Sequence, residues 1–170
     1  MKFVADTREK EGHCWLPPKH REMVRRALRY GDYSVDGLGP NGVPYSHRVC
    51  IERKSLRDWC GSIWGDWKRF SERLAEFRSL DLAAVVIEAT EEDVRKAKYR
   101  PDARSTMRVG RSAIWSAKMD KLPPSEVLAS TARVYAEFGT PVFLAGSPTR
   151  ASAFAFAVLT HWVDRERARQ

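Results

Sequence analysis

The sequence predicts an α/β fold in which a mixed central β-sheet is flanked by helices. Strand-like and helix-like segments alternate along the 170 residues. The run from Ala83 to Glu88 is apolar until its final acid, a pattern typical of a central parallel strand covered on both faces. From Ser147-Pro148 onward, apolar residues recur with helical spacing, which predicts a terminal helix with a capped start. We therefore expect one domain over residues 1–170 with a single hydrophobic core.

The N-terminal third is predicted to contain two strands of a hairpin and two further elements. Lys2–Asp6 has the pattern of a short buried strand that ends on an acid. Lys19–Arg29 is expected to form a helix that Gly31 ends. Asp32–Asp36 and Arg48–Lys54 are expected to pair as a hairpin, because turn-forming residues connect them.

Helices dominate the predicted remainder of the chain. One helix should begin at Leu56, and a second should cover Trp67–Ser79 with its apolar face buried. Further helices are expected over Ser112–Lys118 and Ser125–Phe138. A last strand is expected over Pro141–Ala145.

The charge balance favours a polyanionic partner. Formal net charge is +8 and the pI is about 9.7, which indicates nucleic acid first and a membrane surface second. Residues 94–118 hold eight Lys or Arg and only one acid, Asp102. This basic insertion is expected to contact DNA phosphates, or else to be a solvated loop. The candidate DNA-binding residues are Arg100, Arg104, Arg108 and Arg111.

Cysteine usage and apolar runs bear on location. Cys14, Cys50 and Cys60 are odd in number and lack a CxxC spacing, so neither a zinc site nor a disulfide framework is predicted. The N-terminus lacks the long apolar run of a signal peptide. The most apolar stretch, Ala151–Val163, is too short to span a membrane. We expect an intracellular, cytoplasmic protein without a membrane partner, associated with the nucleoid if it is bacterial or phage-encoded.

The most informative residues for chemistry are Asp32 and the run Glu52-Arg53-Lys54. Side chains alternate along a strand, so Glu52 and Lys54 should project to one face and Arg53 to the other. Asp32 comes from the adjacent hairpin strand and Asp6 from the end of the first strand. These positions predict two or three carboxylates and one ammonium around a single point.

Such a group suits hydrolysis of a phosphodiester bond. Carboxylate oxygens bind Mg²⁺ or Mn²⁺, which leaves further coordination sites for water and phosphate. A bound cation neutralises charge that builds up on the phosphate and lowers the pKa of a bound water. Asp32, Glu52 and Asp6 are the predicted metal ligands, and Lys54 would act on the water or the transition state.

A wider pattern carries a family resemblance. Gly31-Asp32-Tyr33, followed by Glu52-Arg53-Lys54-Ser55-Leu56-Arg57-Asp58, resembles the GD…ERK-x-x-x-D signature of the XPF family of structure-specific endonucleases. Asp6-Thr7-Arg8-Glu9 is similar to that family's first-strand element, an aspartate followed two residues later by an arginine. The resemblance covers most of the chain apart from residues 94–118.

The resemblance implies a restriction-endonuclease-like fold, dependence on Mg²⁺ or Mn²⁺, and cleavage of branched, flapped or junction DNA in repair or recombination. It also implies a homodimer. Asp32 and Glu52 would be metal ligands and Lys54 the catalytic lysine; Asp6, Arg8, Arg53 and Asp58 would complete the active-site cluster. Family members commonly carry a tandem helix-hairpin-helix module after this domain. The chain stops at Gln170, so recognition by that module is not expected here.

Several alternatives remain open from the residues alone. Asp58 also fits a helix cap with Ser55, Arg53 also fits an ion pair behind the sheet, and Asp6 also fits a turn cap. Glu88 is expected to form a structural ion pair. Trp64 and Trp67 are expected in the core, or stacked on an unpaired base.

The function also has alternatives. A non-catalytic DNA-binding subunit of the same fold is one, although this chain keeps the whole acidic cluster. A nuclease of a phage or mobile element with another substrate preference is the other.

Overall fold

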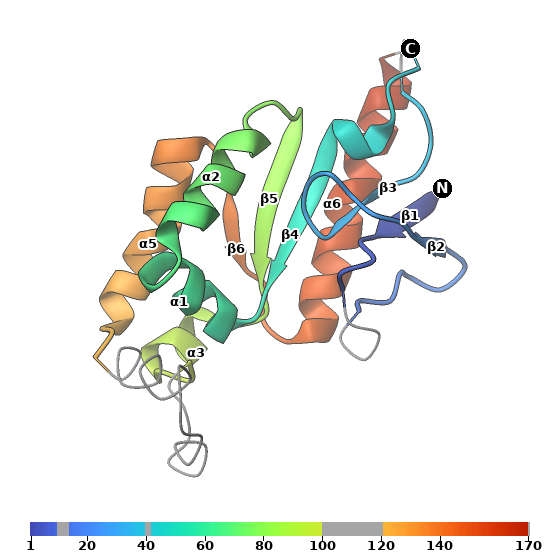
Figure 1. The fold of residues 1–170 in the computed structure, drawn as a ribbon. Coiled ribbons are helices and arrows are strands. Elements are labelled where there is room, and N and C mark those ends of the chain that lie inside the picture. Colours follow the sequence, from blue (N-terminus) through green and yellow to red (C-terminus); the bar gives the residue numbers. More distant parts are fainter. Residues whose placement is uncertain (10–13, 40–41, 100–120, 170) are drawn as a thin grey trace.

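A mixed six-stranded β-sheet forms the centre of the molecule (Figure 1). The computed structural model describes residues 1–9, 14–39, 42–99 and 121–169. The strand order across the sheet is β2-β1-β3-β4-β5-β6. The strands are β1 (Lys2–Ala5), β2 (Glu22–Arg25), β3 (Tyr33–Val35), β4 (Val49–Lys54), β5 (Leu82–Ile87) and β6 (Val142–Leu144). β3 is antiparallel to both of its neighbours, and the other neighbouring pairs are parallel.

Helices cover both faces of this sheet, which confirms the predicted mixed sheet flanked by helices. The helices are α1 (Leu56–Trp64), α2 (Trp67–Phe77), α3 (Glu91–Arg95), α5 (Pro124–Phe138) and α6 (Pro148–Ala168). Side chains of α1, α2 and α5 form one core with alternate residues of β4 and β5. α6 forms the second core with the opposite sheet face, and Figure 1 shows it alone on that side. Among the helices that the structure describes, none is long and apolar enough to cross a membrane.

Most predicted elements lie where the sequence placed them. β3 and β4 pair as the antiparallel hairpin, with Tyr33 opposite Ile51. α6 begins after Ser147, whose hydroxyl oxygen accepts a hydrogen bond from the Arg150 N–H at 3.4 Å. α5 ends at Gly139, which adopts a left-handed conformation with φ of 69°.

The predicted helix over residues 19–29 is wrong. Its centre is the edge strand β2, which pairs in parallel with β1 from Lys2 opposite Glu22 to Ala5 opposite Arg25. Met23 and Val24 are half-buried, and residues 26–29 turn back toward β3. Local apolar spacing suggested a helix, but pairing with a strand 20 residues earlier supplies hydrogen bonds that no local pattern reveals.

The first two residues of the predicted basic insertion, Val94 and Arg95, belong to helix α3. α3 begins with a capping box formed by Thr90 and Asp93, and it extends one residue past Val94. Three of the eight cations counted there pair with acids that precede them: Arg95 with Glu91, Lys96 with Glu92, and Lys98 with Asp93. The helix predicted over Ser112–Lys118 and the four candidate DNA-binding arginines lie outside the described residues.

Apolar side chains of α6 face both the core and the surface. Phe156 and Val163 are fully buried within this chain. Phe154 is 37% exposed and packs against Phe143, which is exposed to the same extent on β6, with ring centroids 4.8 Å apart. An exposed aromatic pair therefore lies where α6 meets the edge of the sheet.

Candidate active site

The predicted site residues gather at one end of the sheet. β1, β4 and β5 are mutually parallel in direction, so their carboxyl ends meet at one edge, together with the start of the antiparallel β3. Asp6 directly follows β1, and Asp32 directly precedes β3. Glu52 and Lys54 lie in the last three residues of β4. The topology therefore brings residues from three separated segments to the same edge.

Alternation along β4 separates its charged side chains as predicted. Glu52 and Lys54 face α2, because Glu52 pairs with Arg73 and the Lys54 ammonium lies 5.3 Å from the centre of the Phe70 ring. Arg53 points to the opposite face of the sheet, where its guanidinium lies 5.8 Å from the Trp15 ring. Glu52 and Lys54 therefore share the sheet face that α1 and α2 cover.

Glu52 has one oxygen bound and one oxygen free. Its side chain is 1% exposed, and Oε1 lies 3.0 Å from Lys54 Nζ and accepts a hydrogen bond from Arg73 Nη1 at 2.7 Å. Oε2 is buried and has no hydrogen-bond partner among the described residues. Leaving a buried carboxylate oxygen unpaired is unfavourable. The oxygen fits a site for a cation.

Asp32 is held against β4 by its backbone and side chain. Its N–H donates to the Ile51 carbonyl at 2.9 Å, and its Oδ2 accepts the Arg53 N–H at 2.8 Å. Burial and the nearby negative charge of Glu52 raise the pKa of Asp32 to about 8, although the Arg53 N–H and Lys54 act in the opposite direction. A divalent cation would stabilise the ionised form of Asp32 and would accept both carboxylates as oxygen ligands.

The backbone immediately before Asp32 requires a glycine, Gly31. It has φ of 63°, and an added Cβ would lie 2.9 Å from both the Cys50 Cβ and the Ile51 carbonyl oxygen. Only glycine fits this approach to β4 without strain. The GD pair therefore has a structural basis, since Gly31 allows Asp32 to reach Arg53.

Asp6 has a different set of partners from the one predicted. Its carboxylate accepts the N–H of Leu28 at 2.6 Å, the N–H of Arg8 at 2.7 Å, and the Arg8 guanidinium at 2.7 and 3.1 Å. Burial acts to raise the pKa of Asp6, but these hydrogen bonds together lower it. Asp6 thus closes a turn, one of the two alternatives left open by the sequence.

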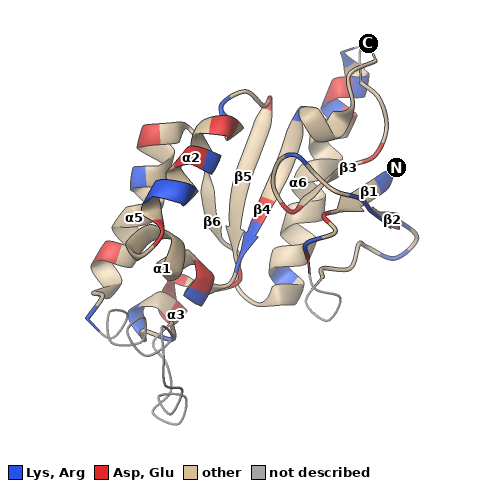
Figure 2. Ribbon diagram, viewed as in Figure 1, with Lys and Arg blue, Asp and Glu red and all other residues tan. Residues whose placement is uncertain are grey.

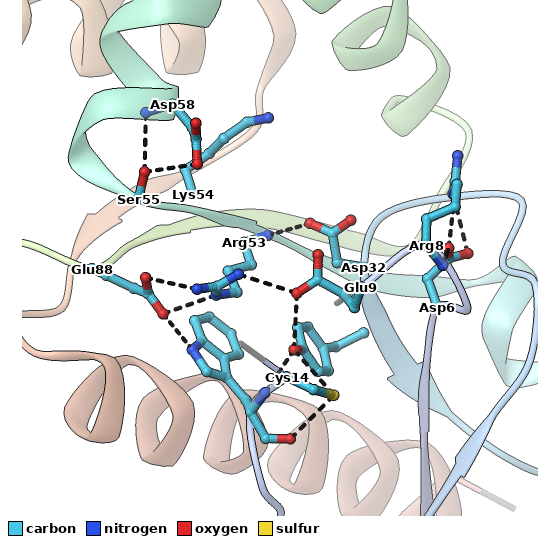
Figure 3. A network of polar contacts seen from close by, with 12 residues as sticks. Asp6, Arg8, Glu9, Cys14, Asp32, Arg53, Lys54, Ser55, Asp58 and Glu88 are labelled. Atoms are coloured by element: carbon cyan, nitrogen blue, oxygen red, sulfur yellow. Dashed lines mark hydrogen bonds and ion pairs between the residues drawn. The ribbon is translucent and has the colours of Figure 1, made fainter. Parts of the chain in front are cut away.

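The structure brings together two of the three predicted metal ligands. Within residues 1–9, 14–39, 42–99 and 121–169, no group of three or more His, Cys, Asp or Glu is arranged to hold a metal ion. Figure 3 shows Asp6 and Arg8 to one side of Asp32. The Arg8 guanidinium is close enough to Asp32 and Glu52 to be affected by their charge. Its hydrogen bond to Asp6 raises the pKa of Arg8, as do the charges of Asp6, Asp32 and Glu52, whereas burial acts to lower it.

Arg53 forms ion pairs on the opposite face of the sheet, which is one of the alternatives that the sequence left open. It donates from Nε and Nη2 to the two Glu88 oxygens at 2.8 and 2.9 Å, and from Nη1 to Glu9 at 3.2 Å. Trp15 Nε1 also donates to Glu88, at 2.7 Å (Figure 3). The structural pairing expected for Glu88 is confirmed. Arg53 reaches the carboxylate pair only through its backbone N–H.

The Ser55 helix cap is confirmed. Its Oγ accepts the Asp58 N–H at 3.1 Å and donates to Asp58 Oδ2 at 2.7 Å. Asp58 is exposed at the start of α1, close to the base of Lys54 in Figure 3. A catalytic part for Asp58 stays a prediction.

Sequence reasoning missed Arg73. It lies on α2 three residues after the buried Phe70 and one residue before the buried Leu74, so it belongs to the helix face that looks toward the sheet. A cation at that spacing from core residues was the available signal. Of the two tryptophans expected in the core, Trp67 is half-buried, with the Arg133 guanidinium 4.0 Å from its ring centre, whereas Trp64 is 46% exposed, so the core prediction is wrong for Trp64.

Comparisons with known proteins agree with the fold and the motif. The family model described as the ERCC4 domain matches residues 5–156. Among curated proteins, none matches this sequence. XPF from Aeropyrum pernix is similar in structure, with a TM-score of 0.60 and 14% identity over 95% of this chain and 61% of that chain. XPF from the same organism in complex with DNA has a TM-score of 0.58 and 16% identity, over 96% of this chain and 66% of the other.

These similarities confirm the restriction-endonuclease-like fold. The chain spans less than two thirds of the length of each Aeropyrum pernix protein.

Proposed function

Because the chain belongs to the ERCC4 domain family, we propose that it is a divalent-metal-dependent endonuclease that hydrolyses phosphodiester bonds in branched, flapped or junction DNA during repair or recombination. The observation that carries this proposal is the unpaired, buried Glu52 Oε2 near the half-buried side chain of Asp32. A structural ion pair at this position would not need a second carboxylate, whereas a cation site would.

Asp32 and Glu52 would hold the cation, Mg²⁺ or Mn²⁺. When bound, the ion supplies charge neutralisation at the phosphate and lowers the pKa of a coordinated water. Asp6 is not needed as a third protein ligand, since hard cations of this kind keep several water ligands. Asp6 instead orders the turn that carries Arg8, whose side chain is 64% exposed while it pairs with Asp6.

Lys54 and Arg73 would act on the reacting phosphate. Both contact Glu52 Oε1, so both cationic groups lie beside the proposed metal ligand Glu52. A cation fixed beside the phosphate stabilises the negative charge that develops in the transition state. The Arg53 N–H keeps Asp32 oriented, and the Arg53–Glu88 pair fixes the end of β4 from the other side.

DNA would be the partner, as it is in one of the similar structures. The arginines of the basic insertion are proposed to add sequence-independent phosphate contacts: Arg100, Arg104, Arg108 and Arg111. We also propose a homodimer that covers the exposed Phe143–Phe154 pair, since two partly exposed aromatic rings on adjoining elements suit a self-complementary interface.

The test is cleavage of end-labelled linear, flapped, forked and four-way DNA by the purified protein with Mg²⁺, with Mn²⁺, and with a chelator. We expect cleavage of branched substrates near the branch point, and none in the chelator. Tight binding of the same substrates without cleavage in either metal would instead identify a non-catalytic DNA-binding subunit. Equal cleavage of linear and branched DNA would indicate a nuclease with another substrate preference.

A further inference from the structure

One border of the sheet is strongly basic. We define the basic edge as the cationic side chains of β2 and its flanking turns, all of which are exposed: Lys19, Arg21, Arg25, Arg26 and Arg29. The two acids beside it are already paired, Glu22 with Lys2 at 3.0 Å and Asp36 with Arg26 at 2.9 Å. The basic edge therefore carries an excess of positive charge, and Figure 2 shows Lys and Arg along this side of the sheet.

The basic edge is joined to the candidate active site by short hydrogen bonds. Leu28, between Arg26 and Arg29, donates its N–H to the Asp6 carboxylate at 2.6 Å and accepts from Arg8 at 3.2 Å. Asp6 in turn donates its backbone N–H to the Asp32 carbonyl at 2.8 Å. Asp6 therefore links the turn that carries Arg26 and Arg29 to the metal-ligand candidate Asp32 through hydrogen bonds.

The surface beside the basic edge is hollowed. A pocket of about 370 Å³ is lined by Arg26, Leu28, Arg29, Leu38, Ser46 and His47, among others. Among the described residues, Arg21 and Arg29 have no acidic partner, so their charge is not neutralised within this part of the chain. The polar side chains that line this concave surface are two guanidinium groups, an imidazole, a hydroxyl and the carboxylate of Asp36, which is paired with Arg26.

We propose that the basic edge binds the phosphate backbone of the duplex arm of a DNA substrate, next to the site at which Asp32 and Glu52 act. This rests on the proposed function, because it names the surface that holds the same substrate. Duplex DNA carries about one negative charge per 1.7 Å of helix axis, so a row of cations of which only Arg26 is paired with an acid among the described residues matches its backbone. Cations spaced along an extended strand bind phosphates irrespective of base sequence.

The experiment measures binding apart from cleavage. Fluorescence anisotropy of a labelled blunt duplex, in a chelator, gives the dissociation constant at several salt concentrations between about 50 and 200 mM. Three double variants are compared with the parent: Arg21→Ala/Arg29→Ala, Arg21→Lys/Arg29→Lys, and the control Lys68→Ala/Arg167→Ala. The control removes the same charge from exposed positions on α2 and α6. Circular dichroism and thermal unfolding verify that each variant is folded.

We expect the Arg21→Ala/Arg29→Ala variant to bind more weakly and to have a salt slope smaller by up to about 1.8, since each lost phosphate contact on duplex DNA removes about 0.9. The lysine variant should keep the parent slope because it keeps both charges. The control should also keep it. An unchanged slope in the alanine variant, or an equal loss in the control, overturns the proposal.

The outcome is separable from that of the proposed function. If the alanine variant binds like the parent but the parent still cleaves branched DNA, the nuclease assignment stands and the basic edge only discourages pairing of β2 with another strand. If the alanine variant loses binding but the parent never cleaves, the basic edge stands and the catalytic assignment fails.

Discussion

Arg73 on α2 donates a hydrogen bond to Glu52 on β4 at 2.7 Å, and this contact fixes which carboxylate oxygen is free. With Oε1 bound by Arg73 and Lys54, Oε2 is the oxygen left for a cation. Arg73 belongs to a helix and was not among the residues that the sequence motif indicates.

Replacement of Arg73 tests this contact. We expect Arg73→Ala to lower single-turnover cleavage by up to about 100-fold, because a freed Glu52 can rotate away from its metal-binding position. The apparent Mg²⁺ affinity should also fall, which a purely structural part for Arg73 would not cause in a folded variant. Arg73→Lys should restore part of the rate. Parent-like rate and Mg²⁺ dependence in Arg73→Ala would remove this residue from the site.

The raised pKa of Asp32 predicts a pH-dependent stability of the metal-free protein. The folded-state pKa of about 8 lies above the ordinary value of 3.8, so the folded state binds more protons than the unfolded state between these values. The contribution of Asp32 is therefore least unfavourable at low pH, and stability falls as pH rises toward 8. The Tm of Asp32→Asn minus that of the parent, measured in a chelator, should increase from pH 5 to pH 8.

Addition of Mg²⁺ provides the control for that measurement. At pH 8 the ion should raise the Tm of the parent and have little effect on Asp32→Asn, since the ion stabilises the ionised carboxylate. A difference in Tm between the two proteins that does not depend on pH would contradict the proposed environment of Asp32.

Gly31 gives a test of the geometry that positions Asp32. Gly31→Ala should destabilise the protein by about 1–3 kcal/mol or more, from the left-handed backbone and the close approach to Cys50 and Ile51. It should also reduce cleavage, because Asp32 follows directly. Gly139→Ala is the matched control: its φ is 69°, but nothing lies within 4 Å of an added Cβ. Denaturant unfolding should show a larger loss for Gly31→Ala, and equal losses would argue against the close approach.

The sequence could predict the parts of the site that depend on local periodicity. Alternation along β4 was enough to separate Glu52 and Lys54 from Arg53, and the spacing of Phe70 and Leu74 was enough to predict α2. The Ser55 cap was visible for the same reason, since its partner Asp58 lies three residues away.

The parts that sequence reasoning missed depend on distant partners. β2 exists because β1 pairs with it, and the apolar residues Met23 and Val24 alone could not distinguish a strand from a helix turn. The Asp6 carboxylate accepts the N–H of Leu28, 22 residues away. Arg73 reaches Glu52 across 21 residues. No spacing rule within a single element reports such contacts.

The exposed pair Phe143–Phe154 predicts the dimer interface. Phe154→Glu should convert the proposed homodimer to a monomer, because it places a charge in a surface that would be desolvated on association. Tyr135→Glu, on α5, is the control, since Tyr135 is 61% exposed on another helix. Sedimentation velocity at tens of micromolar distinguishes the outcomes. A parent protein that sediments as a monomer with and without DNA would contradict the proposed dimer.

The most direct test of the catalytic assignment compares two identical substitutions at different glutamates. Glu52→Gln and Glu72→Gln are assayed for single-turnover cleavage of forked DNA in Mg²⁺, with binding of the same DNA measured in a chelator. Glu72 is exposed on α2, and Glu52 is buried at the proposed cation site. We predict that Glu52→Gln loses at least about 100-fold in rate while it retains DNA affinity, and that Glu72→Gln cleaves like the parent. Parent-like cleavage by a folded Glu52→Gln protein would contradict the account.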